Sequence, residues 1–203
     1  MCGFTGFLTP KQTLNASQAE STLIKMSNAL SHRGPDHQGI WIDSQRGIAL
    51  GHRRLSIIDL SSQGNQPMHS HCGRYVIAFN GEIYNYLCIR KELESFGAAP
   101  EWKGRSDTEI MLAAISYWGL LKAISKFVGM FAFALWDKEK NSLHLSRDRI
   151  GEKPLYYGWM GGVLLFGSEL KALRKHPAWK GEVDPNTLAL FMQYGYVPTP
   201  HSI

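Results

Sequence analysis

Short apolar or alternating runs recur along the chain, and Gly, Asn, Asp and Ser bound them. Runs of this length and composition are typical of β-strands. The predicted strands cover residues 3–8, 39–43, 47–52, 75–80, 129–137, 142–148, 155–160 and 163–169. Because most of these strands follow one another in consecutive pairs, the pattern favours antiparallel pairing.

Segments of helical period lie between the blocks of strands. They span residues 16–30, 85–96 and a region from 106 or 107 to 128 that breaks at Gly119. This order predicts an α+β fold in which helices cover antiparallel sheets, and it disfavours a doubly wound parallel sheet. The end of the chain reads as a short apolar helix and then a Pro-rich extended piece. We therefore expect the N-terminal portion of a longer protein, ending in a linker.

Composition narrows the class of protein. The chain has 203 residues, of which 44% are hydrophobic, enough for one large folded domain. Its 22 Lys and Arg residues exceed its 17 Asp and Glu residues only mildly and are scattered, so nucleic-acid binding is not expected. No apolar run approaches the roughly 18 residues that span a membrane, and no signal peptide is recognisable.

The three cysteines, Cys2, Cys72 and Cys88, have no paired spacing, so no disulfide framework is predicted. A reducing, cytoplasmic location fits best. MHSHC offers His69, His71 and Cys72 as metal ligands, but a closed zinc site needs four ligands and no second cluster is present. We assign no metal.

Other motifs have simple structural interpretations when taken alone. Asn80-Gly81 in FNGEIYNY is the strongest short hairpin signal and so favours a turn. SRDRIGEKPLYYG favours a structural segment in which Arg147 and Asp148 pair. No GxxxxGK[ST] phosphate loop is present, so nucleotide binding within these residues is not supported.

Eight blocks in order change this picture. They are MCGFTGF, SHRGPDHQG, HRRLSIIDLSSQGNQPM, FNGEIYNY, SDTE, GMFAFALWD, RDRIGEKPLYYG and GSELKAL. Together, from Cys2 to about Leu173, they resemble the glutaminase domain of class II glutamine amidotransferases, in the branch of B-type glutamine-dependent asparagine synthetases. The resemblance implies a four-layer αββα fold of the N-terminal nucleophile kind. It also divides the chain into a glutaminase domain, 2–180, and a linker helix with an extended segment, 181–203, leading to a synthetase domain.

The resemblance gives Cys2 a catalytic role. Removal of Met1 would leave a thiol and a free α-amine on one residue. An ordinary thiol has a pKa near 8.5 and needs a base at pH 7, whereas an α-amine has a pKa of about 7.7 to 8.0 and is partly neutral there. Cys2 would then supply both nucleophile and base. It would attack the side-chain amide of glutamine and form a thioester that water hydrolyses.

The other site residues also follow from the resemblance. Asn80, through its side-chain amide, and Gly81, through its main-chain N–H, would bind the oxyanion. Arg54 would bind the α-carboxylate of glutamine, and Asp107 with Glu82 its α-ammonium. The main chain of the next loop would complete the glutamine site, and Gly64 would let a lid move over it. The residues of that loop are Leu55, Ser56, Ile57 and Ile58.

The partners expected from the family lie outside these residues. The glutaminase needs no cofactor, whereas ATP and Mg²⁺ would serve only the synthetase domain, whose Ser-Gly-Gly-x-Asp-Ser loop is not in this sequence. The acceptor of ammonia would be aspartate or, alternatively, a sugar carboxylate in surface-polysaccharide assembly. A non-enzyme alternative is a regulatory domain that binds an amino acid. A homodimer is also compatible with the resemblance.

Overall fold

The computed structural model describes residues 1–10, 13–57, 59–198 and 201, and its strands form two antiparallel sheets. The five-stranded sheet has the order β2-β3-β1-β9-β8, and the four-stranded sheet has the order β4-β5-β6-β7. The first contains β1 (Gly3–Leu8), β2 (His37–Asp43), β3 (Ile48–Arg54), β8 (Tyr156–Met160) and β9 (Val163–Gly167). The second contains β4 (Met68–His69), β5 (Tyr75–Ile83), β6 (Gly129–Asp137) and β7 (Ser142–Arg147).

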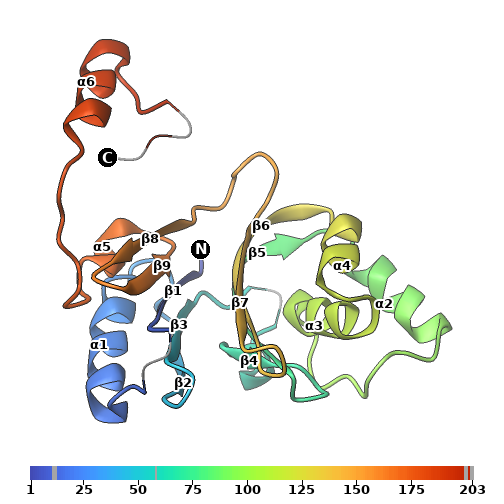
Figure 1. Ribbon diagram of the computed structural model, residues 1–203. Coiled ribbons are helices and arrows are strands. Elements are labelled where there is room, and N and C mark those ends of the chain that lie inside the picture. The colour runs from blue at the N-terminus through green and yellow to red at the C-terminus, as the bar shows by residue number, and fades with distance from the viewer. Residues whose placement is uncertain (11–12, 58, 199–200, 202–203) are drawn as a thin grey trace.

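Helices cover the outer face of each sheet, which gives four layers in the order αββα (Figure 1). The five-stranded sheet is covered by α1 (Ala16–Asn28) and α5 (Leu170–Leu173). The four-stranded sheet is covered by α2 (Tyr86–Ser95), α3 (Asp107–Trp118) and α4 (Leu120–Lys126). The α+β, four-layer prediction is therefore confirmed. A sixth helix, α6 (Pro185–Tyr194), extends away from the sandwich (Figure 1).

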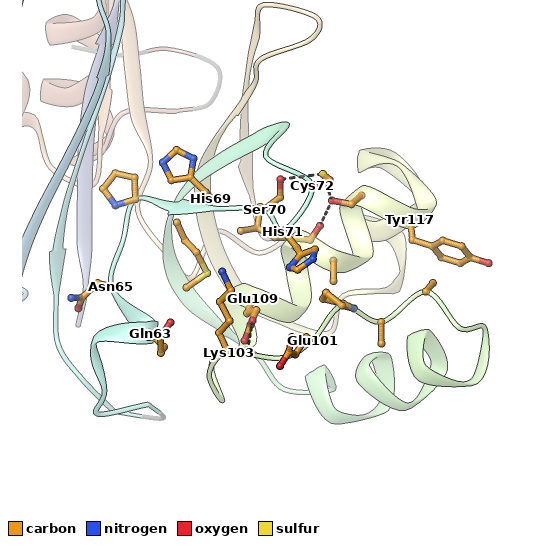
Figure 2. A pocket seen from close by; sticks show the side chains of 18 of the residues that line it. Gln63, Asn65, His69, Ser70, His71, Cys72, Glu101, Lys103, Glu109 and Tyr117 are labelled. Atoms are coloured by element: carbon orange, nitrogen blue, oxygen red, sulfur yellow. Dashed lines mark hydrogen bonds between the residues drawn. The ribbon is translucent and has the colours of Figure 1, made fainter.

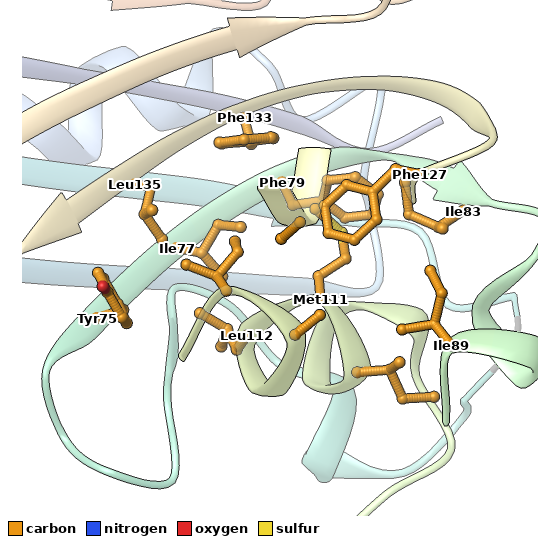
Figure 3. Packing of buried hydrophobic residues seen from close by; sticks show 14 of the residues in the cluster. Tyr75, Ile77, Phe79, Ile83, Ile89, Met111, Leu112, Phe127, Phe133 and Leu135 are labelled. Atoms are coloured by element: carbon orange, nitrogen blue, oxygen red, sulfur yellow. The ribbon is translucent and has the colours of Figure 1, made fainter. Parts of the chain in front are cut away.

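The two-residue period of the strands produces the layers. In β5, Ile77 and Phe79 face α3 (Figure 3), whereas Val76 and Ala78 face the five-stranded sheet. The same alternation in β6, β3, β1 and β9 fills the space between the sheets with Phe4, Ile48, Leu50, Trp136 and Phe166. Each of these five strands thus contributes side chains to two apolar clusters, one on each of its faces. The inward side chains of the two sheets pack against one another.

Local signals set the helix ends. The side chain of Asn15 accepts a hydrogen bond from the main-chain N–H of Gln18 and so caps α1. Ser106 caps α3 in the same way, by accepting from Glu109. Gly119 has a φ of 79°, which an L side chain rarely adopts, and it separates α3 from α4 as the sequence predicted.

Three local predictions were wrong. No turn forms at Asn80-Gly81, because β5 pairs with β6 as far as Ile83 opposite Gly129. β3 extends to Arg54, because it pairs with β2 as far as His37. Met68–His69, placed in an exposed loop from the sequence, forms the short strand β4. In each case pairing with a neighbouring strand of the sheet overrides the local signal.

Candidate active site

Cys2 precedes β1 and lies beside the loop that follows β3. Its Sγ atom accepts a hydrogen bond from the main-chain N–H of Leu55 at 3.3 Å and lies 3.5 Å from the carbonyl oxygen of the same residue. The carbonyl oxygen of Cys2 accepts from Nε of Arg33 at 3.0 Å. Cys2 is therefore held from two sides, although residues near a chain end usually fray.

Arg33 and Glu169 form a support for Cys2 that sequence analysis missed. Arg33 donates from its NH1 nitrogen to Oε1 of Glu169 at 2.9 Å. Although partial burial of this carboxyl opposes the effect, hydrogen bonds from Arg33, Lys171 and His32 lower the pKa of Glu169 to about 2. Both residues lie in the quoted blocks SHRGPDHQG and GSELKAL, but only the folded chain brings them to Cys2.

Asn80 occupies an inward position of β5, two residues after Ala78. Its side chain is 2% exposed, and its Nδ2 nitrogen has no hydrogen-bond partner among the residues that the structure describes. A buried amide donor without a partner costs free energy, so such a group needs an explanation beyond packing. It is available to an acceptor that enters the site.

The edge of β5 beyond the short strand β4 is open, and side chains bind it in place of a strand. Gln66 accepts from the main-chain N–H of Phe79 at 2.7 Å, and Asp107 accepts from that of Ile83 at 2.9 Å. Alternate residues of a strand direct their N–H groups to the same side. The N–H of Gly81, midway between them, therefore points to the same open edge.

Packing gives its own reason for glycine at position 81. A Cβ atom there would lie 2.3 Å from the carbonyl oxygen of Met130 and 2.7 Å from Cα of Phe131. β6 therefore excludes a side chain at this position. The glycine lets β5 and β6 pair closely at the point where Asn80 and Gly81 face the site.

Asp107 and Glu82 bring two carboxyl groups to the site. Asp107 is the first residue of α3 and is buried. Burial is the main cause that raises its pKa to about 6, and the charge of Glu82 adds to it, although the N–H of Ile83 opposes both. A carboxyl that is costly to ionise alone is well suited to a site that receives a cation.

The guanidinium of Arg54 is buried and held by the loop that follows it. Its NH1 nitrogen donates to the carbonyl oxygen of Ser61 at 2.7 Å and to Oδ1 of Asn65 at 2.8 Å, and NH2 donates to the carbonyl oxygen of Asp59. A Cβ atom at Gly64 would lie 2.2 Å from that NH2. Gly64 therefore leaves room for the Arg54 guanidinium in the arrangement seen here.

The predicted loop residues divide into three groups. Leu55 contacts the Cys2 thiol through its main chain, as described above. Ile57 lines the cavity that also contains Cys2, which is described next. Ser56 does not line that cavity, and its N–H donates to Asp36 at 2.7 Å. Ile58 lies outside the described residues.

A cavity of about 160 Å³ joins these groups, and at about 30 Å³ per water it has room for roughly five waters. This is the scale of a small metabolite. The site residues predicted from the sequence that line this cavity are Cys2, Arg54, Leu55, Ile57, Asn80, Gly81, Glu82 and Asp107. The structure therefore brings together the described site residues of the prediction, with Ser56 as the exception.

Lys153 also lines this cavity and was missed by sequence analysis. It is 6% exposed, and its Nζ lies 3.3 Å from Sδ of Met1.

The predicted pairing of Arg147 with Asp148 was wrong. Asp148 accepts main-chain N–H groups of Gly151, Glu152 and Lys153, because it closes the turn that delivers Lys153 to the cavity.

A larger cavity of about 990 Å³ is lined in part by Gln63 and Asn65 of the loop that follows β3 (Figure 2). His69, His71 and Cys72 of MHSHC line it, but none of the predicted glutamine-site residues does. Within the part of the chain that the structure describes, no group of three or more His, Cys, Asp or Glu side chains is placed to hold a metal ion. We therefore place the chemistry at the smaller cavity.

Fold and cavity together define a four-layer αββα domain whose candidate active site is lined by Cys2. The chain belongs to the glutamine amidotransferase domain family, whose model matches residues 1–203. A glutamine-hydrolysing asparagine synthetase 3 of Bacillus subtilis is 39% identical over 202 residues, which is 98% of this chain and 32% of that protein. A putative asparagine synthetase 2 of Methanocaldococcus jannaschii is 34% identical over an alignment of 221 positions, which covers 100% of this chain and 41% of that protein.

Solved structures agree on the fold. Glutamine phosphoribosylpyrophosphate amidotransferase from B. subtilis superposes with a TM-score of 0.69 at 20% identity, covering 85% of this chain and 43% of that chain. A structure described as the allosteric regulatory enzyme of purine biosynthesis gives 0.70 at 21% identity, covering 86% and 43%. The chain spans about a third to two fifths of the length of the asparagine synthetases above. None of the described helices is both long and apolar enough to cross a membrane.

Proposed function

We propose that this domain hydrolyses glutamine to glutamate and ammonia through a thioester on Cys2. The observation that carries the proposal is the buried Nδ2 of Asn80, which has no partner among the described residues and lines the same cavity as the Cys2 thiol. A donor kept free at such a place is suited to an oxyanion. Membership of the amidotransferase family supports the same chemistry.

The reaction has two halves. The sulfur of Cys2 attacks the side-chain amide carbon of glutamine, and the amide oxygen becomes an oxyanion that Asn80 Nδ2 and the Gly81 N–H stabilise. The intermediate collapses to a thioester when ammonia leaves with the proton taken from the thiol. Water then attacks the thioester, passes through a second oxyanion and releases glutamate with the free thiol.

Charged groups at the cavity would orient the substrate. The α-carboxylate of glutamine would bind Arg54, and its α-ammonium would lie between Asp107 and Glu82. The raised pKa of Asp107 supports this assignment, because an incoming cation would favour the ionised carboxylate. Main-chain groups of Leu55 and Ile57 would complete the contact with the substrate.

The presence or absence of Met1 decides whether Cys2 has a free α-amine that can act as the base. While Met1 is present, the nitrogen of Cys2 is an amide and cannot accept a proton. Met1 also lines the cavity, so its removal would both free the α-amine and enlarge the space for glutamine. We infer that the active form begins at Cys2.

The remainder of the function concerns a partner domain. We infer that the ammonia passes to an ATP- and Mg²⁺-dependent synthetase domain that follows the 181–203 linker, with aspartate as acceptor and a sugar carboxylate as the alternative. Support comes from the names and length of the relatives, and from α6, whose Phe191, Met192 and Tyr194 are exposed.

The free thiols of Cys72 and Cys88 favour a cytoplasmic location. A homodimer stays a prediction.

The test compares release of glutamate from L-glutamine with binding of L-glutamine, on protein whose intact mass shows that Met1 is removed. We expect turnover that falls about 100-fold or more in Asn80→Ala. Gln38→Ala is the control, because its Nε2 is also buried without a partner among the described residues but does not line this cavity. Binding of glutamine without turnover in the wild type would instead support a regulatory amino-acid-binding domain.

A further inference from the structure

His52 connects the two sheets next to the candidate oxyanion donors. It lies on β3, two residues before Arg54, and is fully buried at 0% exposure. Its Nε2 lies 2.9 Å from the carbonyl oxygen of Phe79 on β5. That carbonyl belongs to the peptide group that leads directly into Asn80.

The ring has one defined protonation state. Burial lowers the pKa of His52 to about 4, against the opposing effect of the Phe79 carbonyl, so the ring is neutral at neutral pH. A neutral imidazole carries one N–H, and a carbonyl oxygen only accepts. The proton therefore lies on Nε2, and Nε2 donates to Phe79.

Packing alone does not account for a histidine here. Ile48 and Leu50 precede it on the inward face of the same strand and fill the space between the sheets with apolar side chains. His52 Nδ1 is buried without a partner in the described part of the chain, which is a cost that an apolar residue would avoid. What the histidine provides is a polar bond from the Cys2-bearing sheet to the Asn80-bearing strand.

We infer that His52 is a positioning residue of the glutaminase reaction, because its Nε2–H fixes the Phe79 peptide group and thereby the Asn80 amide relative to the Cys2 thiol. This inference rests on the proposed function. Cys2 precedes β1, whose Phe4 pairs with His52 across the sheet, so the nucleophile and the tether share one rigid unit. The opposite end of the tether is one residue from the oxyanion donor.

Variants at position 52 separate the hydrogen bond from packing. His52→Phe keeps a ring and removes the donor, whereas His52→Gln places an amide N–H near the position of Nε2. We expect His52→Phe to lower kcat for glutamine hydrolysis by at least about tenfold, up to the 100- to 1000-fold typical of a lost oxyanion donor, with KM little changed. His52→Gln should stay within a few-fold of wild type. Leu50→Ala, on the same face of β3, is the control for general loosening and should leave kcat within a few-fold.

A double-mutant cycle with Asn80→Ala tests whether His52 acts through Asn80. If it does, His52→Phe lowers kcat in the wild-type background and has almost no further effect in Asn80→Ala. The rate at which iodoacetamide alkylates Cys2, followed on its own peptide, should stay near the wild-type value in His52→Phe. An equal loss of kcat in both backgrounds, or an unchanged kcat in His52→Phe, overturns the inference.

A folding failure does not remove the test. If His52→Phe does not fold, His52→Asn takes its place, because its shorter amide cannot reach the Phe79 carbonyl. Its kcat is then compared with that of His52→Gln. Lower kcat for Asn than for Gln supports the tether, and equal kcat overturns it. Absence of glutamine hydrolysis in the wild type with Met1 removed is a different result, because it contradicts the proposed function itself.

Discussion

The Nε nitrogen of Arg33, in the turn that follows α1, donates to the carbonyl oxygen of Cys2, just before β1, at 3.0 Å. The same guanidinium pairs with Glu169 at 2.9 Å. Through Arg33, Cys2 is thereby linked to the turn that follows α1 and to Glu169 at the start of α5. Arg33 therefore holds the main chain of the proposed nucleophile through the carbonyl oxygen and not through the sulfur.

Replacement of Arg33 by Gln should reduce glutamine hydrolysis. A hydrogen bond from a charged group contributes about 1.5–3 kcal/mol, so we expect kcat to fall roughly ten- to a hundredfold as the Cys2 carbonyl loses its partner. Steady-state kinetics on protein with Met1 removed measures this. Arg53→Gln is the matched control, because Arg53 bonds Ser27 and Asn28 at α1 and not Cys2. Equal losses in both variants would contradict a specific role for Arg33.

Asp107 should make glutamine binding depend on pH. Its folded pKa is about 6, so below pH 6 the carboxyl is protonated and no longer attracts the substrate ammonium. We expect the Kd for glutamine to rise by up to about tenfold per pH unit as pH falls below 6. Titration calorimetry on Cys2→Ala, which cannot turn over, measures Kd directly. In Cys2→Ala/Asp107→Asn the Kd should be higher at pH 7 and much less dependent on pH.

Asp107 should also cost stability at neutral pH. Its pKa rises from 3.8 in the unfolded chain to about 6 in the folded one, so the folded state binds the extra proton between these values. Unfolding free energy therefore falls as pH rises from about 4 to 6, by about 3 kcal/mol in all. Asp107→Asn should be more stable than wild type at pH 7 and equally stable near pH 3.5. Urea unfolding at the two pH values decides this, and equal stability at pH 7 would contradict the buried, costly carboxylate.

His52 should have the opposite pH dependence. Its pKa falls from 6.5 in the unfolded chain to about 4 in the folded one, so only the unfolded state gains a proton between pH 6.5 and 4. Unfolding free energy should drop by about 3 kcal/mol over that window as pH is lowered. His52→Gln has no titrating group and should lose about 2 to 3 kcal/mol less than wild type between pH 7 and 4.5. Parallel pH profiles for the two proteins would rule out this account of His52.

Gly64 should matter for substrate affinity. A methyl group at this position would lie 2.2 Å from NH2 of Arg54, and such overpacking costs about 1–3 kcal/mol. Because the Arg54 guanidinium must move, we expect Gly64→Ala to raise KM for glutamine roughly tenfold with little change in kcat. Gly158→Ala is the control, since a Cβ atom there meets no heavy atom within 4 Å. A KM that stays at the wild-type value would show that the loop adapts without moving Arg54.

The order of the strand and helix patterns was enough to predict helices over antiparallel sheets, whereas the four-layer arrangement was implied by the family resemblance. The local signal failed at Asn80-Gly81, where pairing with Ala132 and Phe131 of β6 overrides the turn signal. The ordered motifs indicated Cys2 and its partners by resemblance. They gave no role to Arg33, whose contact with Glu169 spans 136 positions, or to Lys153, whose contact with Met1 spans 152. Such contacts have no local sequence pattern and depend on the packed sheets.

The central claim is that the thiol of Cys2, with its amine freed, is the nucleophile. The most direct measurement is glutamate release by wild type and Cys2→Ala, each confirmed by intact mass to lack Met1. Cys72→Ala and Cys88→Ala are matched controls, because these thiols are exposed and do not line the Cys2 cavity. We predict loss of glutamate release in Cys2→Ala alone. Glutamate release by Cys2→Ala at the wild-type rate would contradict the account.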